Sequence, residues 1–243
     1  VIGVYGGTWR RGFKGVSDTW GPTKMVRNNL TWYNLDLSVR ASIAESWEIN
    51  DDASEWTWHL RKGMKWSDGS DFTSENFMWY YEYVLLNEEL TTTPLSQLST
   101  GNPLVMSTWS APDDHTVVMA FADPNPLLAY NVIGHQNPPF RPSEYMKQYH
   151  IDFVDADTLN AMAVEEGFET WVALYEDRDW WYMDENCPCI FPWKPVNTLD
   201  NELFVMERNP YFWQVDAEGN QLPYIDKVTH RLFETVDVFN MWI

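Results

Sequence analysis

Residues 47–60 alternate apolar and polar side chains, and this pattern constrains the fold of the chain more than any other feature. Trp56 and Trp58 are two positions apart, and residues at that spacing share one face of a β-strand. Trp47 and Ile49 show the same spacing before a polar stretch with the composition of a turn. The pattern therefore predicts two antiparallel strands with their tryptophans on one face.

A third strand of the same antiparallel meander is predicted at Met64 and Trp66, after a turn at residues 61–63. Burial of a tryptophan ring removes about 150–250 Å² from water, so core packing is its usual role. The tryptophans on the strand faces are therefore expected to form a packed core rather than a sugar-binding platform. They are Trp47, Trp56, Trp58 and Trp66.

A helix is predicted to begin after Thr73, which has the side chain of an N-cap residue, with Glu75 in the first turn. Position 76 is Asn rather than Glu or Gln, so a complete capping box is not expected. Apolar residues at helical spacing predict two more helices, separated at Gly167. These helices cover residues 159–163 and 168–175, and further strands are expected at 116–121, 202–207 and 228–234.

The chain is strongly acidic, with 36 Asp and Glu against 16 Lys and Arg and a formal net charge of −20. This charge argues against a phosphate backbone as a natural partner, so no nucleic-acid binding is expected. No run of eighteen apolar residues predicts a membrane-spanning helix. Cys187 and Cys189 flank one proline, too close for an unstrained disulfide, and two free or buried thiols are expected.

The motifs of nucleotide-binding loops, zinc proteases and serine hydrolases do not occur in the sequence. We expect no cofactor, no metal site and no catalytic residue. Residues 216–220 superficially suggest a calcium loop, but they lack its further ligands, and a tight turn is expected instead. Carboxylates are so abundant that a glycosidase pair could be chosen anywhere, so this enzyme class is only an alternative.

The distribution of strands predicts two subdomains. Short strands cluster early and late in the chain, with helices and further strands between them. We expect an α/β subdomain made of residues 1–40 and 191–243, and an inserted subdomain of residues 41–190 that contains the meander and helices.

An ordered series of motifs resembles one known family. AESWE, HLRKG, a DG turn and a helix start at Thr73 follow one another within residues 41–85. They resemble the family 5 extracellular solute-binding proteins, of the oligopeptide- and dipeptide-binding type that serves ABC importers. YGGTWRR, APDDHTVVMAF, PFRPSEYMKQYH and RNPYFWQVDAEGNQLPYID extend the resemblance over almost the whole chain. Asn76 replaces the usual Asp, which should weaken only a contact at the helix start.

The resemblance implies an α/β fold, the class II periplasmic-binding-protein fold, with a mixed-sheet lobe and an inserted α+β subdomain. Family members are usually much longer, so the chain is expected to be a first-lobe fragment with the second lobe absent. The implied function is capture of oligopeptides outside the cytoplasmic membrane for an ABC permease, without catalysis. An oligosaccharide ligand is the alternative. The protein is expected to be a monomer that is periplasmic or lipid-anchored.

Four residues are candidates for ligand contact. The resemblance places part of the cleft wall in the loop after the first strand, which contains Ser17, Asp18 and Trp20. Trp32 is a further candidate because, like Trp20, it lacks periodic apolar neighbours. Family members often hold peptide termini with charged groups of the second lobe, so the residues that select the solute are expected largely outside this sequence.

Overall fold

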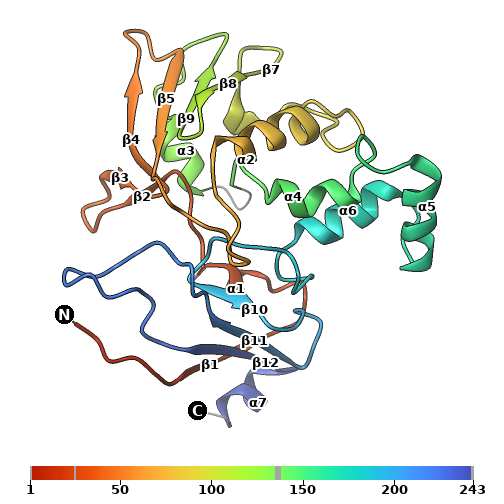
Figure 1. The fold of residues 1–243 in the computed structure, drawn as a ribbon. Coiled ribbons are helices and arrows are strands. Elements are labelled where there is room, and N and C mark those ends of the chain that lie inside the picture. The colour runs from red at the N-terminus through yellow and green to blue at the C-terminus, as the bar shows by residue number, and fades with distance from the viewer. Residues whose placement is uncertain (1, 25, 135–137, 242–243) are drawn as a thin grey trace. The chain divides into compact units, whose positions relative to one another are not determined.

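The computed structural model describes residues 2–24, 26–134 and 138–241 (Figure 1). The chain divides into two compact units, and each unit combines segments that are distant in the sequence. Unit 1 contains residues 1–27, 65–70 and 144–243, and unit 2 contains residues 28–64 and 71–143.

The core of unit 2 lies on one face of an antiparallel sheet with the order β4-β5-β9-β8. Trp56 and Trp58 of β5 are 1% and 0% exposed, and their rings stack with centroids 5.3 Å apart. Trp47 lies opposite Trp58 but is only half-buried, because β4 is an edge strand. The predicted tryptophan face is thus confirmed. The strands are β4 (Ala44–Ile49), β5 (Glu55–Leu60), β8 (Thr108–Asp113) and β9 (Thr116–Ala120).

The predicted third strand of the meander at Met64 and Trp66 is wrong. The second neighbour of β5 is β9, which follows more than fifty residues later in the sequence and brings Val117 opposite Trp58. Val117 is fully buried, so this pairing extends the apolar face of the sheet. Trp66 is buried as predicted, but it belongs to unit 1 rather than to this face.

Helix α2 (Ser74–Trp79) begins with a complete capping box, contrary to the sequence-based expectation. The Thr73 hydroxyl accepts a hydrogen bond from the Glu75 amide (3.3 Å), and Oδ1 of Asn76 accepts one from the Thr73 amide (3.0 Å). An amide oxygen accepts a hydrogen bond as a carboxylate does, so Asn serves here in place of Glu or Gln. Asn76 Nδ2 also donates to the Ser143 hydroxyl (3.0 Å), a second contact within unit 2.

Replacing Asn76 by Ala is expected to lower the free energy of unfolding by about 1–2 kcal/mol, because the half-buried Thr73 amide and the buried Ser143 hydroxyl both lose a partner. Asn76→Asp is the matched control: it keeps the acceptor for Thr73, and the Ser143 hydroxyl can turn to donate to it. Its cost should be smaller. Urea unfolding of both variants measures the difference, and an equal cost would show that the cap contact contributes little.

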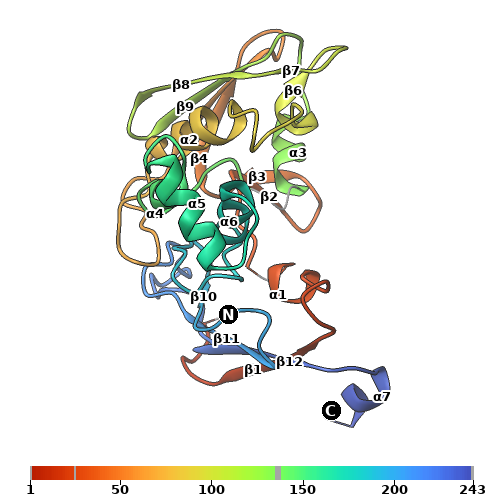
Figure 2. The same cartoon turned by 90° about the vertical axis from the view of Figure 1, so that its right-hand side faces the viewer.

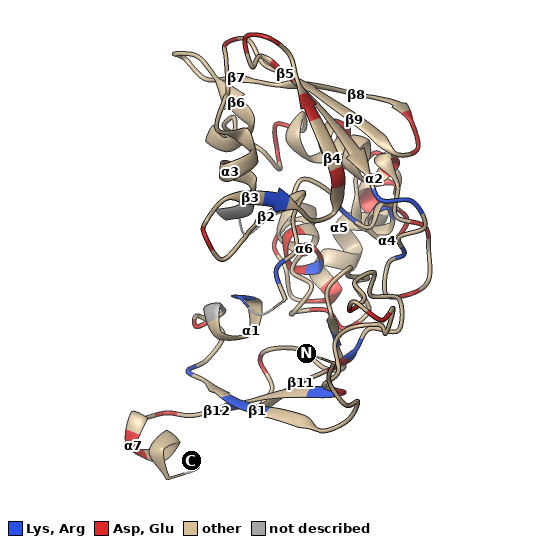
Figure 3. Cartoon of the chain, turned by 90° about the vertical axis from the view of Figure 1, so that its left-hand side faces the viewer, with Lys and Arg blue, Asp and Glu red and all other residues tan. Residues whose placement is uncertain are grey.

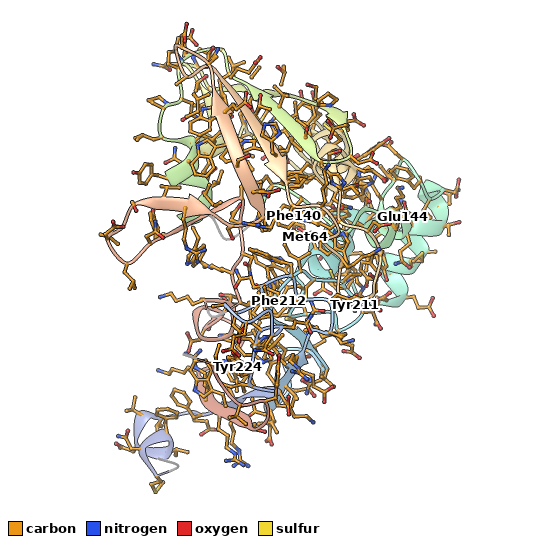
Figure 4. The ribbon with its side chains drawn as sticks, turned by 60° about the vertical axis from the view of Figure 1, so that its left-hand side comes forward. Met64, Phe140, Glu144, Tyr211, Phe212 and Tyr224 are labelled. Carbon is orange, nitrogen blue, oxygen red and sulfur yellow. The ribbon has the colours of Figure 1, made fainter. Side chains whose placement is uncertain are left out.

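The other elements of unit 2 surround this sheet. The chain continues from α2 directly into the π-helix η1, and Phe140, labelled in Figure 4, packs edge-to-face against Phe72 with ring centroids 5.0 Å apart. Hairpin β2–β3 lies beside α3. The bounds are β2 (Thr31–Tyr33), β3 (Val39–Ala41), η1 (Tyr80–Leu85), η2 (Ser96–Leu98), β6 (Ser99–Thr100), β7 (Val105–Met106) and α3 (Leu128–Gly134).

Unit 1 is built on a mixed sheet with the order β1-β12-β11-β10. β1 runs parallel to β12, and the other neighbours are antiparallel. Phe204, Met206 and Val228 are fully buried on its inner face. The strands are β1 (Thr8–Phe13), β10 (Trp193–Pro195), β11 (Leu203–Arg208) and β12 (Lys227–Leu232), which confirms strands at all the expected early and late positions.

The helices predicted on either side of Gly167 are present as α5 (Ala156–Glu165) and α6 (Trp171–Asp179), which pack together (Figure 2). Asp155 caps α5 and Thr170 caps α6 through their side chains. The remaining helices are α1 (Trp20–Lys24), α4 (Ser143–Met146), η3 (Lys147–Tyr149) and α7 (Val236–Asn240).

The boundaries of the units differ from the predicted subdomains in three places. The Thr31 hydroxyl of β2 donates to the carbonyl of Ala129 in α3 (2.6 Å), which ties the β2–β3 hairpin to unit 2. The Trp181 ring lies 6.5 Å from that of Phe204 in β11, which ties the end of the helical region to unit 1. The sequence predicted that residues 1–40 and 191–243 form one subdomain and residues 41–190 the other. In the structure, residues 28–40 lie in unit 2, and residues 65–70 and 144–190 lie in unit 1.

Candidate functional site

The loop after β1 carries two of the predicted ligand contacts in unit 1. The carboxylate of Asp18 accepts a hydrogen bond from the Lys14 amide (3.1 Å), and the Asp18 amide donates to the carbonyl of Gly15 (2.9 Å). Ser17 is exposed and Asp18 is half-buried. The turn therefore presents a hydroxyl and a carboxylate beside each other at the end of a strand, where they can hydrogen-bond a polar solute.

Arg11 connects helix α1, which follows this loop, to the sheet. Its Nη1 donates to the carbonyl of Gly21 in α1 (3.2 Å), and its guanidinium carbon lies 5.1 Å from the centre of the Trp9 ring. Since Arg11 and His230 are register partners in β1 and β12, they lie next to each other on the sheet. Helix α1 is thus tied to the sheet through the Arg11 side chain.

Three of the four predicted contacts are neighbours in the sequence and lie in unit 1. Ser17, Asp18 and the backbone of Trp20, the first residue of α1, follow one another in unit 1. The side chain of Trp20 lies outside the described part of the structure. Trp32 belongs to unit 2, where it is half-buried in β2 opposite Arg40.

A cavity of about 430 Å³ lies at the other end of β1, and the sequence analysis did not anticipate it. Gly6 and Gly7 both have positive φ angles (128° and 87°), a region that favours glycine. Trp9 beside them is 43% exposed. The sequence GGTW at residues 6–9 could therefore have indicated this cavity. The lining residues are Gly6, Gly7, Thr8, Trp9 and Ile225.

The cavity and the loop after β1 are distinct features. Thr8 and Trp9 at the start of β1 line the cavity, whereas the loop follows Phe13 at its end, so residues 10–13 lie between the two features, about 13 Å along an extended strand. Neither Ser17 nor Asp18 lines the cavity. The candidate site for a solute in unit 1 is therefore the loop, and the cavity is a second feature of the same strand.

The cavity wall is held by Tyr224, which is labelled in Figure 4. Its hydroxyl donates to the carboxylate of Asp216, its carbonyl accepts from the Gly6 amide (2.9 Å), and its ring leaves no space for a Cβ atom on Gly3. Tyr5 packs edge-to-face against it with ring centroids 5.2 Å apart. The N-terminal segment is thereby fastened to the loop before β12.

Asp216 also forms the turn that was predicted at residues 216–220. Its Oδ1 accepts hydrogen bonds from the amides of Glu218 (2.8 Å) and Asn220 (2.9 Å). Hydrogen bonds from the Tyr224 hydroxyl and the Asn220 side chain hold the pKa of this carboxyl well below its usual range. The tight turn is confirmed, and internal donors already occupy both carboxylate oxygens.

Cys187 and Cys189 are both buried thiols, as expected. Burial raises the pKa of the Cys189 thiol to about 11, so it remains protonated and unreactive at neutral pH. Within residues 2–24, 26–134 and 138–241, no three His, Cys, Asp or Glu side chains are grouped so as to bind a metal ion. The helices of this same part of the chain are all too short or too polar to cross a bilayer.

The chain is similar in sequence and in structure to known periplasmic and oligopeptide-binding proteins. The periplasmic α-galactoside-binding protein of Rhizobium meliloti is 29% identical over 202 residues, which cover 83% of this chain and 27% of that protein. A solved structure of the oligopeptide-binding protein OppA matches 99% of this chain with a TM-score of 0.91 and 33% identity. The periplasmic binding protein MelB of Agrobacterium fabrum, solved with stachyose, matches 96% with a TM-score of 0.73 and 26% identity.

These matches confirm the expected mixed α/β fold of periplasmic binding proteins. The chain covers 37% of the OppA structure and 35% of the MelB structure, so it spans about a third of these relatives. Residues 38–240 match the model of the bacterial extracellular solute-binding proteins, family 5, middle region. The sequence motifs, the mixed sheet and this match agree, and the chain belongs to the family 5 bacterial extracellular solute-binding proteins.

Proposed function

We propose that the full-length protein is the solute-binding component of an ABC importer and that it captures oligopeptides. The observation that carries this proposal is the match to OppA, which combines a TM-score of 0.91 with 33% identity over 99% of the chain. Family membership further supports a binding role rather than catalysis. The importer's permease is the proposed partner, and the protein acts as a monomer outside the cytoplasmic membrane, free in the periplasm or lipid-anchored.

An oligosaccharide ligand is the second candidate, and two relatives favour it specifically. The α-galactoside-binding protein of Rhizobium meliloti covers 83% of this chain, and the MelB structure contains stachyose. Oligopeptides and galactosides make different demands on a cleft. A peptide backbone is held by strand-like hydrogen bonds, whereas sugar rings stack on aromatic side chains.

Isothermal titration of the full-length protein decides between these ligands. A library of tri- to pentapeptides is titrated in parallel with stachyose and shorter α-galactosides. Heat with peptides and none with sugars supports the first proposal. Heat with stachyose and none with peptides would support the oligosaccharide ligand instead. In a separate assay, turnover of aryl-glycosides would indicate an enzyme.

We further propose that Ser17, Asp18, Trp20 and Trp32 contact the ligand. If Trp20 stacks on the ligand, Trp20→Ala is expected to weaken binding roughly tenfold, which corresponds to about 1.4 kcal/mol. Trp180→Ala is the matched control, because Trp180 is an exposed tryptophan of unit 1 that belongs neither to the loop nor to the cavity. Titration calorimetry with the ligand identified above measures both variants, and an unchanged affinity of Trp20→Ala would remove this residue from the site.

A further inference from the structure

Helix α1 depends on the sheet of unit 1 for its position. It has only five residues, and a helix of that length is not stable by itself. Pro22 and Thr23 are buried, so the helix packs against the unit. A Cβ atom on Gly21 would lie 3.9 Å from the carbonyl oxygen of Gly12, which places α1 directly against the end of β1. Contacts at this junction therefore decide where Trp20, the first residue of α1, is held.

Arg11 spans this junction with its side chain. Its Nη1 donates to the carbonyl of Gly21 (3.2 Å), and a hydrogen bond from a charged donor is stronger than one between neutral groups. The guanidinium carbon also lies 5.1 Å from the centre of the ring of Trp9, which is on the same face of β1. Figure 3 shows basic residues in blue on the β1–β12 strand pair, and from the end of β1 the chain runs to α1. Arg11 thus fastens α1 to the strand that precedes it.

The neighbour of Arg11 on the sheet carries no charge at neutral pH. His230 is its register partner in β12, and side chains at paired positions of neighbouring strands lie on the same face. Burial, together with the charge of Arg11, lowers the pKa of His230 to about 4. On its other side His230 is paired with Phe204 of β11, an apolar ring whose centre is 6.1 Å away. Among the charged side chains of the described residues, Arg11 is the one that shifts this pKa, so no like charge from His230 opposes Arg11 at neutral pH.

We propose that Arg11 is a positioning residue for solute binding: its hydrogen bond to Gly21 holds α1 on the sheet and thereby holds the predicted contact Trp20 where it meets the solute. This role rests on the proposed function and on Trp20 as a ligand contact. If α1 is docked in only a fraction of the molecules, the apparent affinity falls in proportion to that fraction. Loss of the Gly21 contact therefore lowers the affinity, although Arg11 itself does not touch the solute.

The test compares binding rates of the full-length wild type and Arg11→Met, which keeps an apolar stem and removes both the donor and the charge. The probe is the peptide or galactoside that gives the largest heat in the titrations above. The association rate constant should fall roughly tenfold, because fewer molecules have α1 docked, while the dissociation rate constant stays unchanged. Loss of a group that touches the solute would instead raise the dissociation rate constant. Stopped-flow tryptophan fluorescence measures both constants.

Arg10→Met is the matched control, because Arg10 is the next residue on β1, is exposed and lies on the opposite face of the sheet. It should bind at wild-type rates. Arg11→Lys keeps a charged donor and should recover most of the association rate. Hydrogen exchange of the solute-free proteins, followed by mass spectrometry, reports on α1 directly. The Thr23 amide, which donates to the carbonyl of Thr19 (3.0 Å), should exchange at least tenfold faster in Arg11→Met and at the wild-type rate in Arg10→Met.

The outcomes separate the role of Arg11 from the proposed function. Wild-type association of Arg11→Met overturns the positioning role, and so does faster dissociation alone, which would make Arg11 a ligand contact. Faster exchange of α1 at unchanged affinity would show that solute binding does not depend on where α1 is held, and would overturn the role as well. A wild type that binds neither peptide nor galactoside contradicts the proposed function itself, whereas faster exchange in Arg11→Met would still show that Arg11 docks α1. Arg11→Gln serves in the same comparisons if Arg11→Met does not fold.

Discussion

Replacement of Trp58 by Ala is expected to lower the free energy of unfolding by about 3–5 kcal/mol, since it empties a large volume at the centre of the unit 2 sheet. Trp58 is 0% exposed and packs against Trp56 on its own strand and Trp47 on the neighbouring strand. Its register partner on the other side is the buried Val117. Urea unfolding followed by circular dichroism measures the loss.

Phenylalanine substitutions distinguish ring packing from hydrogen bonding. Trp56 Nε1 donates to the carbonyl of Asn125 (3.1 Å), whereas Trp58 Nε1 has no hydrogen-bond partner among the described residues. Trp56→Phe removes a hydrogen bond and Trp58→Phe removes none. The first should therefore cost about 1 kcal/mol more than the second. A larger cost for Trp58→Phe would mean that its indole nitrogen has a role that the packing does not explain.

Acidification from pH 7 is expected to destabilise unit 1 through His230. Burial, together with the nearby charge of Arg11, lowers the pKa of His230 from 6.5 to about 4. The unfolded chain binds a proton near pH 6.5 while the folded chain resists it, so stability is complete above pH 6.5 and is lost as the pH falls towards 4. The loss from this group amounts to about 3 kcal/mol.

His230→Leu should flatten this part of the stability curve. His230 is 0% exposed, and within the described residues neither ring nitrogen has a hydrogen-bond partner, so leucine removes two unsatisfied polar atoms at little cost in volume. Urea unfolding at several pH values between 7.5 and 4.5 tests this. His59→Leu, on the outer face of β5, controls for removal of any histidine. Parallel curves for wild type and His230→Leu would contradict the assignment.

Local features of the fold followed from the sequence, because they depend on neighbouring residues. The alternation around Trp56 and Trp58 predicted strand β5 and its buried face, and Thr73 marked the start of α2. The turn at residues 216–220 followed from Gly219 and Asn220. In each case the determining contacts lie within a few residues of one another.

Strand pairings and side-chain contacts between distant segments could not be predicted from the local sequence pattern. Trp56 and Trp58 would suit any apolar strand as a neighbour, so the alternation gave no reason to prefer β9 over residues 64–66. Similarly, Asn76 has the same chemistry in the sequence whether or not Ser143 lies within reach. The capping box became evident only when the backbone placed an amide oxygen opposite Thr73.

The candidate site shows the same limit. The resemblance directed attention to Ser17, Asp18 and Trp20, and the structure shows the turn that holds the first two. The cavity beside Trp9 needs Ile225, more than two hundred residues later, for its wall.

The sequence by itself determined the family, the acidic character of the chain and the periodic faces of its strands and helices, since these are properties of composition and local spacing. Only the tertiary structure decided which strands are neighbours, where the two units divide, and that Leu35 and Leu37 stand exposed between β2 and β3. The exposure of a side chain depends on what the rest of the chain covers. From the sequence alone a pair of leucines would be expected in the core, and only the folded chain shows that it is exposed.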